Sequence, residues 1–381
     1  MKIGITTHYY KSLNYGGNLQ AYALCKVLKD MGHECEQMCY TDSGTEQDGT
    51  TKTSGAGKLR RYISLIKPWL YMQKSKRLAK KYGIVKRRRV AFANFNENMI
   101  PHGAEIYTPD TLNKANEIYD AFITGSDQVW NLRGKTDFYF LKFANGRPKI
   151  SYAASIAKED LSPDQKLFFN DALSDFKAVS VRESSAVSLL KNTQKSIVQT
   201  LDPTLLLSRE EWDEVAEEIK PFEKYVFCYF LGVNKKSYKI ARKFASKHGL
   251  KLVNIPIAGG RLRLDDTKYG DARLFDTSPE QFISLIKNAE YVFTDSFHAV
   301  VFANIYQKQY FVFNRNPEGA MSSRITDITT LFDQNERFCA GKERENVNYI
   351  ESLSPIDYSK PSPRFEEMKT ASIDFLKGAL S

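Results

Sequence analysis

Apolar positions along this chain follow two patterns, short continuous runs and longer stretches with helical spacing. The run Lys2–Thr7 predicts a buried strand, and Gly17–Met31 predicts a helix because its apolar residues recur three and four positions apart. Further strands are predicted at His33–Tyr40, Tyr119–Thr124, Lys149–Ala153, Ala178–Val181, Ser196–Thr200, Tyr225–Leu231, Leu250–Ile255, Tyr291–Thr294 and Gln309–Phe313. Further helices are predicted at Lys58–Asn98 with interruptions at Pro68 and Gly83, Pro163–Phe176, Ser184–Lys191, Arg209–Ile219, Lys236–His248, Pro279–Asn288, His298–Tyr306, Ser323–Phe332 and Arg364–Leu380.

Strands that alternate with helices predict parallel sheets joined by right-handed crossovers. The pattern breaks at Asp202-Pro203 and then resumes, so we expect an α/β protein of two Rossmann-like domains facing a cleft. The first domain is expected at 1–205, the second at 206–360, and a final helix at 361–381. Asp202-Pro203-Thr204 itself is interpreted as a connector between the domains.

The positive charge is concentrated in one segment. The 381 residues have a formal net charge of +10, yet Gly49–Asn96 carries 14 Lys and Arg and no acidic residue, so the rest is mildly acidic. We therefore expect a basic helical insertion at 49–98 in the first domain. A solvated basic helix is the first interpretation. Because tryptophan and aliphatic residues are interleaved, contact of 58–89 with an anionic membrane is the second, and nucleic acid is the least favoured partner.

Composition excludes several classes of protein. Hydrophobic residues make up 42% of the chain, enough for two cores, and no apolar run reaches the roughly 18 residues of a membrane-spanning helix. The N-terminus reads as a strand rather than a secretory signal. Five scattered cysteines without a CxxC pair fit a reducing cytoplasm and suggest no zinc site. We expect no bound metal.

Two polar motifs follow strands of the first domain, where sites of parallel sheets lie. The motif NYGGNLQ after the first strand offers Asn14, Tyr15, Gly16, Gly17 and Gln20, and its paired glycines permit close approach of a polar ligand to a helix N-terminus. The motif TGSDQVWN offers Ser126, Asp127, Gln128 and Trp130, a combination of hydrogen-bonding groups and an aromatic ring that suits a sugar. A tight turn and a helix cap are the structural alternatives.

Three further candidates are charged or titratable. Arg182 ends a strand and suits bidentate binding of a carboxylate or phosphate. The run Thr294–His298 ends a strand in Asp295 and Ser296 and opens a helix with His298, which suits proton donation near neutral pH. Arg324 offers a further cation before a helix, although a surface arginine is the simpler interpretation.

Six motifs in this order, NYGGNLQAYAL, ITGSDQVWN, ISYAAS, SVRES, LDPTLLL and TDSFHAVVFANI, resemble the polysaccharide pyruvyl transferase family over roughly residues 1–335. The resemblance implies a GT-B-like fold. It also implies transfer of a pyruvyl group from phosphoenolpyruvate, as co-substrate and with no other cofactor, to a sugar of a bacterial capsule, exopolysaccharide or cell-wall glycan. The product would be a pyruvate ketal, with phosphate released.

Carried over by motif, the resemblance places Asp127, Arg182 and His298 in the active site. We expect His298 to be the general acid, with Asp295 orienting it, and Asp127 to orient or deprotonate a hydroxyl. Arg182, Arg324 and Ser296 are expected to bind the donor, and the residues of the two first-domain motifs the acceptor. The chain departs from several relatives by carrying Ser296 where they have arginine, and Arg324 is the expected substitute.

Two alternatives stay open at this point. One is a glycosyltransferase of GT-B fold that uses a nucleotide sugar as donor. The other is a non-catalytic glycan-binding or assembly factor at the membrane, which would not need Arg182 and His298 to lie together. The acceptor is expected to be a sugar or a lipid-linked oligosaccharide. We expect a cytoplasmic protein, with the inner face of the membrane as a peripheral location.

Overall fold

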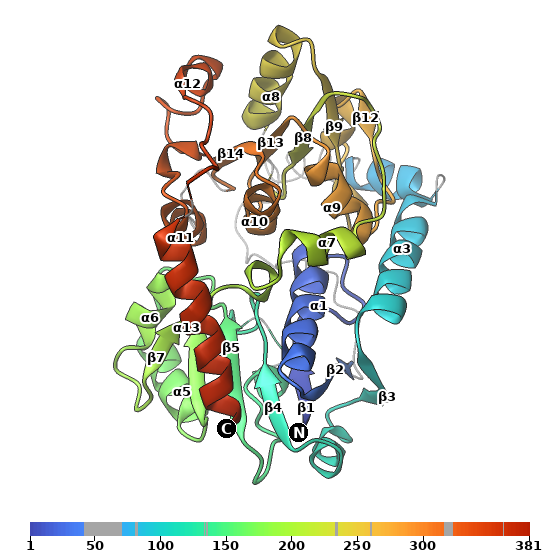
Figure 1. Cartoon of the computed structure of the whole chain (residues 1–381). Coiled ribbons are helices and arrows are strands. Elements are labelled where there is room, and N and C mark those ends of the chain that lie inside the picture. The colour runs from blue at the N-terminus through green and yellow to red at the C-terminus, as the bar shows by residue number, and fades with distance from the viewer. Residues whose placement is uncertain are drawn as a thin grey trace, which may run out of the picture.

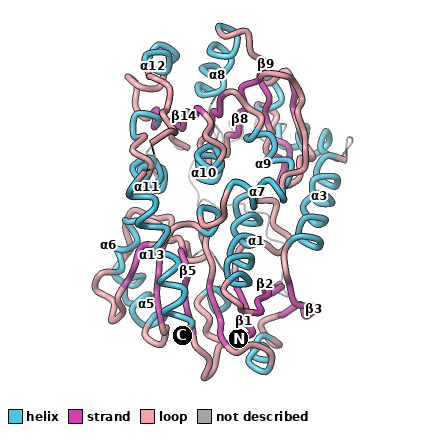
Figure 2. Tube along the Cα trace, viewed as in Figure 1, coloured by secondary structure: helices cyan, strands magenta, loops and turns pink. Residues whose placement is uncertain are grey.

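The computed structural model describes residues 1–41, 71–80, 83–132, 134, 136–232, 235–259, 261–315, 323–360 and 362–381. Within these ranges the chain forms two parallel sheets, one above the other in Figure 1, with helices packed against them. Helices and strands alternate through both halves of the molecule (Figure 2). Residues 42–70, which include the start of the basic segment and the predicted interruption at Pro68, lie outside the described residues.

The first sheet has seven strands in the order β3-β2-β1-β4-β5-β6-β7, and every neighbouring pair is parallel. Its strands are β1 (Lys2–Thr6), β2 (Glu34–Tyr40), β3 (His102–Tyr107), β4 (Ala121–Thr124), β5 (Lys149–Ala154), β6 (Ala178–Val181) and β7 (Ile197–Gln199). Its helices are α1 (Tyr15–Asp30), α3 (Ile84–Met99), α4 (Thr136–Tyr139), α5 (Pro163–Leu173) and α6 (Ser184–Leu190). The strand order reverses between β1 and β4, which is where ligands bind in sheets of this type.

The second sheet has six parallel strands in the order β12-β9-β8-β13-β14-β15. Its strands are β8 (Tyr225–Tyr229), β9 (Lys251–Asn254), β12 (Ala272–Arg273), β13 (Tyr291–Thr294), β14 (Gln309–Phe313) and β15 (Phe338–Cys339). The helices after β7 are α7 (Arg209–Val215), α8 (Lys235–Lys247), α9 (Pro279–Lys287), α10 (Phe297–Ile305), α11 (Ser323–Leu331), α12 (Val347–Ser352) and α13 (Pro363–Leu380). Here the order reverses between β8 and β13.

Several helices begin where their sequence provides a complete cap. The hydroxyls of Ser162, Ser208 and Ser278 each accept a hydrogen bond from the backbone N–H three residues on, and the N–H of each serine donates to the side-chain oxygen of the Gln or Glu at that position. These capping boxes satisfy backbone donors that a helix start would otherwise leave unpaired. They explain why α5, α7 and α9 begin at the predicted positions.

Several short elements of the structure have no counterpart among the predicted ones. Strand β3 shows only one buried residue in six, so it lacks an apolar signal, and β12 and β15 are two residues long. A hairpin of β10 (Ala258–Gly259) and β11 (Arg261–Leu262) lies in the stretch after the predicted strand Leu250–Ile255, where no element was expected. Strands β3, β12 and β15 lie at the edges of the two large sheets, and the β10–β11 hairpin is a separate small sheet. None of them changes the order of the central strands.

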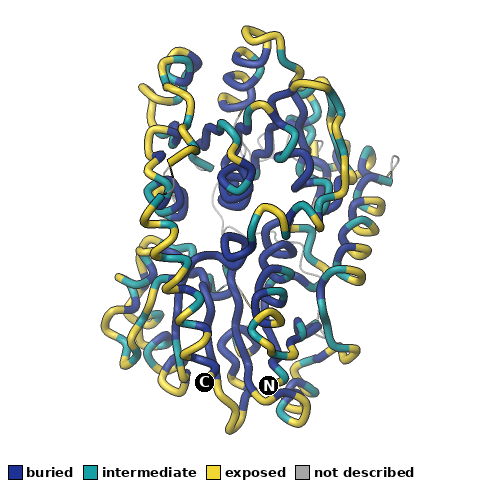
Figure 3. The backbone as a smooth tube through the Cα atoms, in the orientation of Figure 1, coloured by how far each residue is buried: buried dark blue, intermediate teal, exposed yellow. Residues whose placement is uncertain are grey.

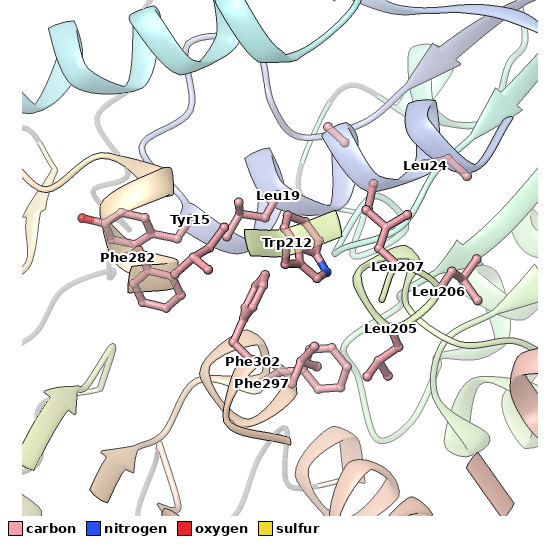
Figure 4. Close-up of a cluster of buried hydrophobic side chains, with 14 of the residues drawn as sticks. Tyr15, Leu19, Leu24, Leu205, Leu206, Leu207, Trp212, Phe282, Phe297 and Phe302 are labelled. Atoms are coloured by element: carbon pink, nitrogen blue, oxygen red, sulfur yellow. The ribbon is translucent and has the colours of Figure 1, made fainter. Parts of the chain in front are cut away.

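The two domains share a continuous apolar core (Figure 4). Tyr15 and Leu19 of α1 lie in one cluster with Trp212 of α7, Phe282 of α9 and Phe302 of α10. The rings of Tyr15 and Phe282 are stacked with centroids 4.5 Å apart, and those of Trp212 and Phe302 meet edge to face at 4.9 Å. Figure 3 shows the same zone as buried backbone in the middle of the molecule. The N-terminal end of α1 is therefore held against the second domain.

The described part of the basic segment also joins the domains. It comprises a helix at 71–80 and α3, whose N-cap is Gly83 in a left-handed conformation, so the predicted interruption at Gly83 is confirmed. Arg88 is buried on α3, donates to the carbonyl of Pro256 at 3.0 Å and lies 5.0 Å from the Tyr15 ring. Not all of the positive charge in this segment is therefore exposed. Among the described helices, none combines the length and apolarity needed to cross a membrane.

Candidate active site

Charged side chains from both domains converge where the carboxyl ends of the two sheets meet. Asp127 follows β4, Arg182 follows β6, and His298 lies in the first turn of α10, just after β13. Asp202 lies between β7 and the short 3₁₀ turn Pro203–Leu205. All four side chains are buried, with only 1–7% of each residue exposed. Sheet topology explains the convergence, because polar side chains at strand ends of facing parallel sheets point into the same space.

Asp202 is the centre of this group. Its Oδ2 accepts a 2.8 Å hydrogen bond from Nη1 of Arg182 and a 2.9 Å bond from the Ser126 hydroxyl, and it lies 3.5 Å from Nε2 of His298. Its Oδ1 accepts from the backbone and hydroxyl of Thr204. Burial raises the pKa of this carboxyl, but His298 and Arg182 outweigh burial and hold the pKa far below its usual range. Asp202 is therefore an anion that joins the arginine to the histidine.

Asp127 is held in an unusual backbone conformation. Its φ is +67°, in the left-handed region, and its carbonyl accepts from the N–H groups of Val129 and Ser155. Its carboxylate accepts a 3.3 Å hydrogen bond from the Asn14 amide and lies 3.6 Å from Nη2 of Arg182. Burial raises the Asp127 pKa, and the surrounding cations, Arg182 first, more than offset that effect, so the pKa is lowered. This carboxyl group is consequently ionised and oriented.

The paired glycines at the start of α1 allow both domains to approach this group closely. A Cβ atom on Gly16 would lie 1.9 Å from Nδ1 of His298, and a Cβ on Gly17 would lie 2.5 Å from the carbonyl of His8 and 3.6 Å from Asp127. The imidazole therefore packs directly on the helix backbone, which no residue with a side chain would permit. The N-terminal end of α1, with its partial positive charge, faces the Asp127 carboxylate.

Two more arginines lie near the group. Arg324, the second residue of α11, is buried, and its burial together with repulsion from Arg182 lowers its pKa to about 10. Arg315 follows β14, donates to the carbonyl of Asp295 at 3.3 Å, and also lowers the pKa of Arg324. A cation whose charged form is disfavoured in this way would be stabilised by a bound anion.

Asp295 and Ser296 differ from expectation. The Asp295 carboxylate accepts 2.7 Å hydrogen bonds from the backbone N–H groups of Leu231 and Gly232, so it fixes the loop after β8. The carboxylate beside His298 is Asp202, and the prediction that Asp295 orients the histidine is corrected accordingly. Ser296 is buried at the N-cap of α10 without a capping bond from its side chain, and its N–H donates to the hydroxyl of Thr294.

Three predicted acceptor residues are structural instead. Trp130 is 0% exposed and stacks on Phe140 in the core of the first domain, so it has no face for a sugar. Tyr15 is buried in the domain junction and donates to the carbonyl of Thr277 at 2.9 Å. Gln20 is fully buried and donates to the carbonyl of Gly17. Composition of the motifs could not separate these buried residues from exposed ones.

Two other members of the motifs lie at the site, since Ser126 binds Asp202 and the exposed Asn14 binds Asp127. Gln128 is partly buried, and its backbone carbonyl lies 3.1 Å from Nε2 of His8. Asp202 and Arg315 are functional candidates that the sequence alone does not identify. Asp-Pro is a common turn signal, so Asp202 reads as a connector between domains. For Arg315, the one available signal is its position just after a strand. Among the described residues, no three His, Cys, Asp or Glu side chains are placed to hold a metal.

Comparison with solved structures identifies the fold. The chain is similar to UDP-GlcNAc 2-epimerase from Methanocaldococcus jannaschii, with 11% identity, a TM-score of 0.53, and 99% of this chain and 100% of that one covered. It is also similar to a protein described as a UDP-N-acetylglucosamine 2-epimerase from Listeria monocytogenes, with 10% identity, a TM-score of 0.51, and 100% and 96% covered. The predicted GT-B-like fold of two Rossmann-like domains is confirmed.

Comparison by sequence identifies the family. No curated protein matches the chain in sequence. A family model does match it, over residues 14–317, and is described as polysaccharide pyruvyl transferase. The matched range begins with the motif at Asn14 and includes Asp127, Arg182, Asp202 and His298.

Proposed function

The chain belongs to the polysaccharide pyruvyl transferase family, and we propose that it transfers the pyruvyl group of phosphoenolpyruvate to a sugar of a bacterial surface polysaccharide. The observation that carries this proposal is the contact of both Arg182 and His298 with Asp202, at 2.8 and 3.5 Å. A glycan-binding protein without catalysis has no need to hold a cation and a titratable group against one buried carboxylate, at the cost of desolvating all three.

The donor carries a carboxylate and a phosphate, so its site needs positive charge. We assign donor binding to Arg182 and Arg324, with Arg315 nearby. The lowered pKa of Arg324 supports this assignment, because burial first, and the neighbouring Arg182 second, disfavour a charged form that a bound anion would stabilise. Arg324 would thereby replace the arginine that several relatives carry at the position of Ser296.

The proposed reaction needs one proton donor and two acceptor hydroxyls. His298 protonates C3 of the enol phosphate while the first hydroxyl bonds to C2, and the proton that this hydroxyl loses returns to His298. The second hydroxyl then bonds to C2 and closes the ketal as the C2–O bond to phosphate breaks, and the phosphate leaves with the proton of the second hydroxyl. Asp202 is the positioning residue, since its carboxylate lies beside Nε2 of the imidazole. The lowered pKa of Asp127 makes it a weak base, so we assign it the role of a hydrogen-bond acceptor that orients a hydroxyl rather than of a general base.

A lipid-linked acceptor and contact with an anionic membrane remain part of the proposal. The helix at 71–80 exposes Lys74, Lys76, Arg77 and Lys80, which supports contact with an anionic surface. Arg88, in contrast, is used for packing between the domains. We also propose a cytoplasmic location and the use of phosphoenolpyruvate with no other cofactor, on the basis of membership of the family.

The experiment that tests this proposal is a calorimetric titration of the full chain with phosphoenolpyruvate and, separately, with UDP-N-acetylglucosamine. The proposal predicts binding of phosphoenolpyruvate. Binding of the nucleotide sugar alone would favour the alternative of a glycosyltransferase with GT-B fold, an alternative that similarity of fold by itself does not support.

A further inference from the structure

A cavity of about 490 Å³ lies between α3 and the loop that joins β1 to α1. Its volume falls within the range of roughly 300–1,000 Å³ that is typical of small-molecule sites. One wall is the loop Tyr9–Leu13. The opposite wall is a single face of α3, formed by residues spaced three and four apart, namely Arg89, Phe92, Ala93, Asn96 and Glu97. Figure 1 shows α3 on the flank of the molecule, beside α1.

The lining combines aromatic rings with cations. Tyr9, Tyr10 and Phe92 contribute rings, and the Lys11 ammonium lies 5.2 Å from the centroid of the Tyr10 ring. Within the part of the chain that the structure describes, neither Lys11 nor Arg89 forms an ion pair. The backbone of Lys11 has a φ of +56°, a strained conformation for a residue with a side chain. The loop is thus held in a costly shape that directs a cationic residue to this cavity.

A polar atom on the α3 face has no partner. The side-chain oxygen of Asn96 is buried and accepts no hydrogen bond from any described residue. A buried acceptor without a donor is unfavourable, and a hydroxyl group of a bound ligand would satisfy it. Glu97 also lines the cavity, and its carboxylate lies 3.5 Å from Nε2 of His102, so its negative charge faces an imidazole.

The cavity adjoins the proposed acceptor site. The loop Tyr9–Leu13, which forms one wall of the cavity, is followed in sequence by Asn14. The side-chain amide of Asn14 donates a 3.3 Å hydrogen bond to the Asp127 carboxylate. We propose that the cavity binds the anionic saccharide segment adjoining the sugar that is modified. Its ring packs on Tyr10, a hydroxyl donates to Asn96, and its anionic group pairs with Lys11 and Arg89. This inference rests on the proposed function, since it extends the acceptor site of that reaction.

The test measures binding of saccharides to the full chain by saturation-transfer NMR, in the absence of phosphoenolpyruvate. The probes are glucose 1-phosphate, N-acetylglucosamine 1-phosphate, glucuronate and the matching neutral sugars. The variants are Arg89→Gln and Asn96→Ala, with Lys86→Gln as the matched control, because Lys86 is exposed on α3 outside the cavity. We expect an anionic probe to bind about tenfold more tightly than its neutral partner, as one charge-assisted hydrogen bond provides.

The expected advantage of the anionic probe is lost in Arg89→Gln and retained in Lys86→Gln, and Asn96→Ala weakens all the probes that bind. A preference for the sugar phosphates would assign the anion to a phosphate, and a preference for glucuronate would assign it to a uronic acid. Equal binding to wild type and Arg89→Gln, or no binding of any probe, would overturn the proposal. Because no donor is present, failure of phosphoenolpyruvate to bind would refute the proposed function without affecting this result.

Discussion

The replacement Asp202→Asn removes the charge that joins Arg182 to His298 while keeping nearly the same shape. The hydrogen bonds from Thr204 to Oδ1 can persist, but the new amide group would face two donors, Nη1 of Arg182 and the Ser126 hydroxyl. Breaking a buried ion pair by removing one partner typically costs about 3–5 kcal/mol, because the remaining charge is left uncompensated. We therefore expect the free energy of unfolding to fall by about that amount.

A double-mutant cycle can isolate the free energy of the interaction between Asp202 and Arg182. Urea unfolding would be followed by tryptophan fluorescence for wild type, Asp202→Asn, Arg182→Gln and the double variant, with Ser126→Ala as a control that removes a neutral donor to Asp202. The control should lose about 1 kcal/mol. The double variant should lose less than the sum of the single variants, by up to about 3 kcal/mol, since residues in direct contact are coupled.

Additive effects in this cycle, within about 0.5 kcal/mol, would refute the reasoning. So would an Asp202→Asn variant no less stable than Ser126→Ala. Either result would make Asp202 an ordinary cap of the 3₁₀ turn that follows it. In the proposed reaction, a positioning role would also lower kcat in Asp202→Asn, because the carboxylate beside Nε2 of the imidazole is lost.

Two further predictions follow from the same geometry. Gly16→Ala should reduce both activity and thermal stability, because its Cβ would lie 1.9 Å from Nδ1 of His298. The control Gly378→Ala, whose Cβ meets nothing within 4 Å, should leave activity unchanged and should not lower thermal stability. An active and stable Gly16→Ala variant would contradict the close packing. The pKa of the Asp202 carboxyl is lower in the folded protein than in the unfolded chain, where it is about 4. Ionised Asp202 therefore contributes its full stabilisation of the fold above about pH 4, and this stabilisation is lost as the pH falls further. Wild type should therefore lose more stability than Asp202→Asn when urea unfolding is compared at pH 5 and pH 3, and parallel losses would contradict the assignment.

The arrangement of the central strands could be predicted from sequence because each is a continuous apolar run between helices with helical spacing. The strands β6, β13 and β14 have the predicted bounds. Short or exposed edge strands carry no such signal, which is why β3, β12 and β15 were missed. The predicted domain bounds remain a prediction, although the two sheets are drawn from residues before and after the break at 203.

The candidate site was predicted only in part. Position after a strand identified Asp127, Arg182 and His298 as candidates, because the ends of parallel strands meet. Which polar side chain points inward and which is buried depends on tertiary packing, so Trp130 could not be distinguished from a sugar-stacking ring. The partner of His298 was assigned to the nearest carboxylate in sequence, whereas Asp202 is nearest in space.

The calorimetric titration with phosphoenolpyruvate tests the central claim most directly. It needs no acceptor, and Arg324→Gln provides a donor-site variant whose fold should tolerate the change, since burial already disfavours the charged form of Arg324. Arg364→Gln, which alters an exposed arginine on α13, is the matched control. The account predicts that phosphoenolpyruvate binds to wild type and Arg364→Gln and binds at least tenfold more weakly to Arg324→Gln. Binding of UDP-N-acetylglucosamine but not of phosphoenolpyruvate would contradict it.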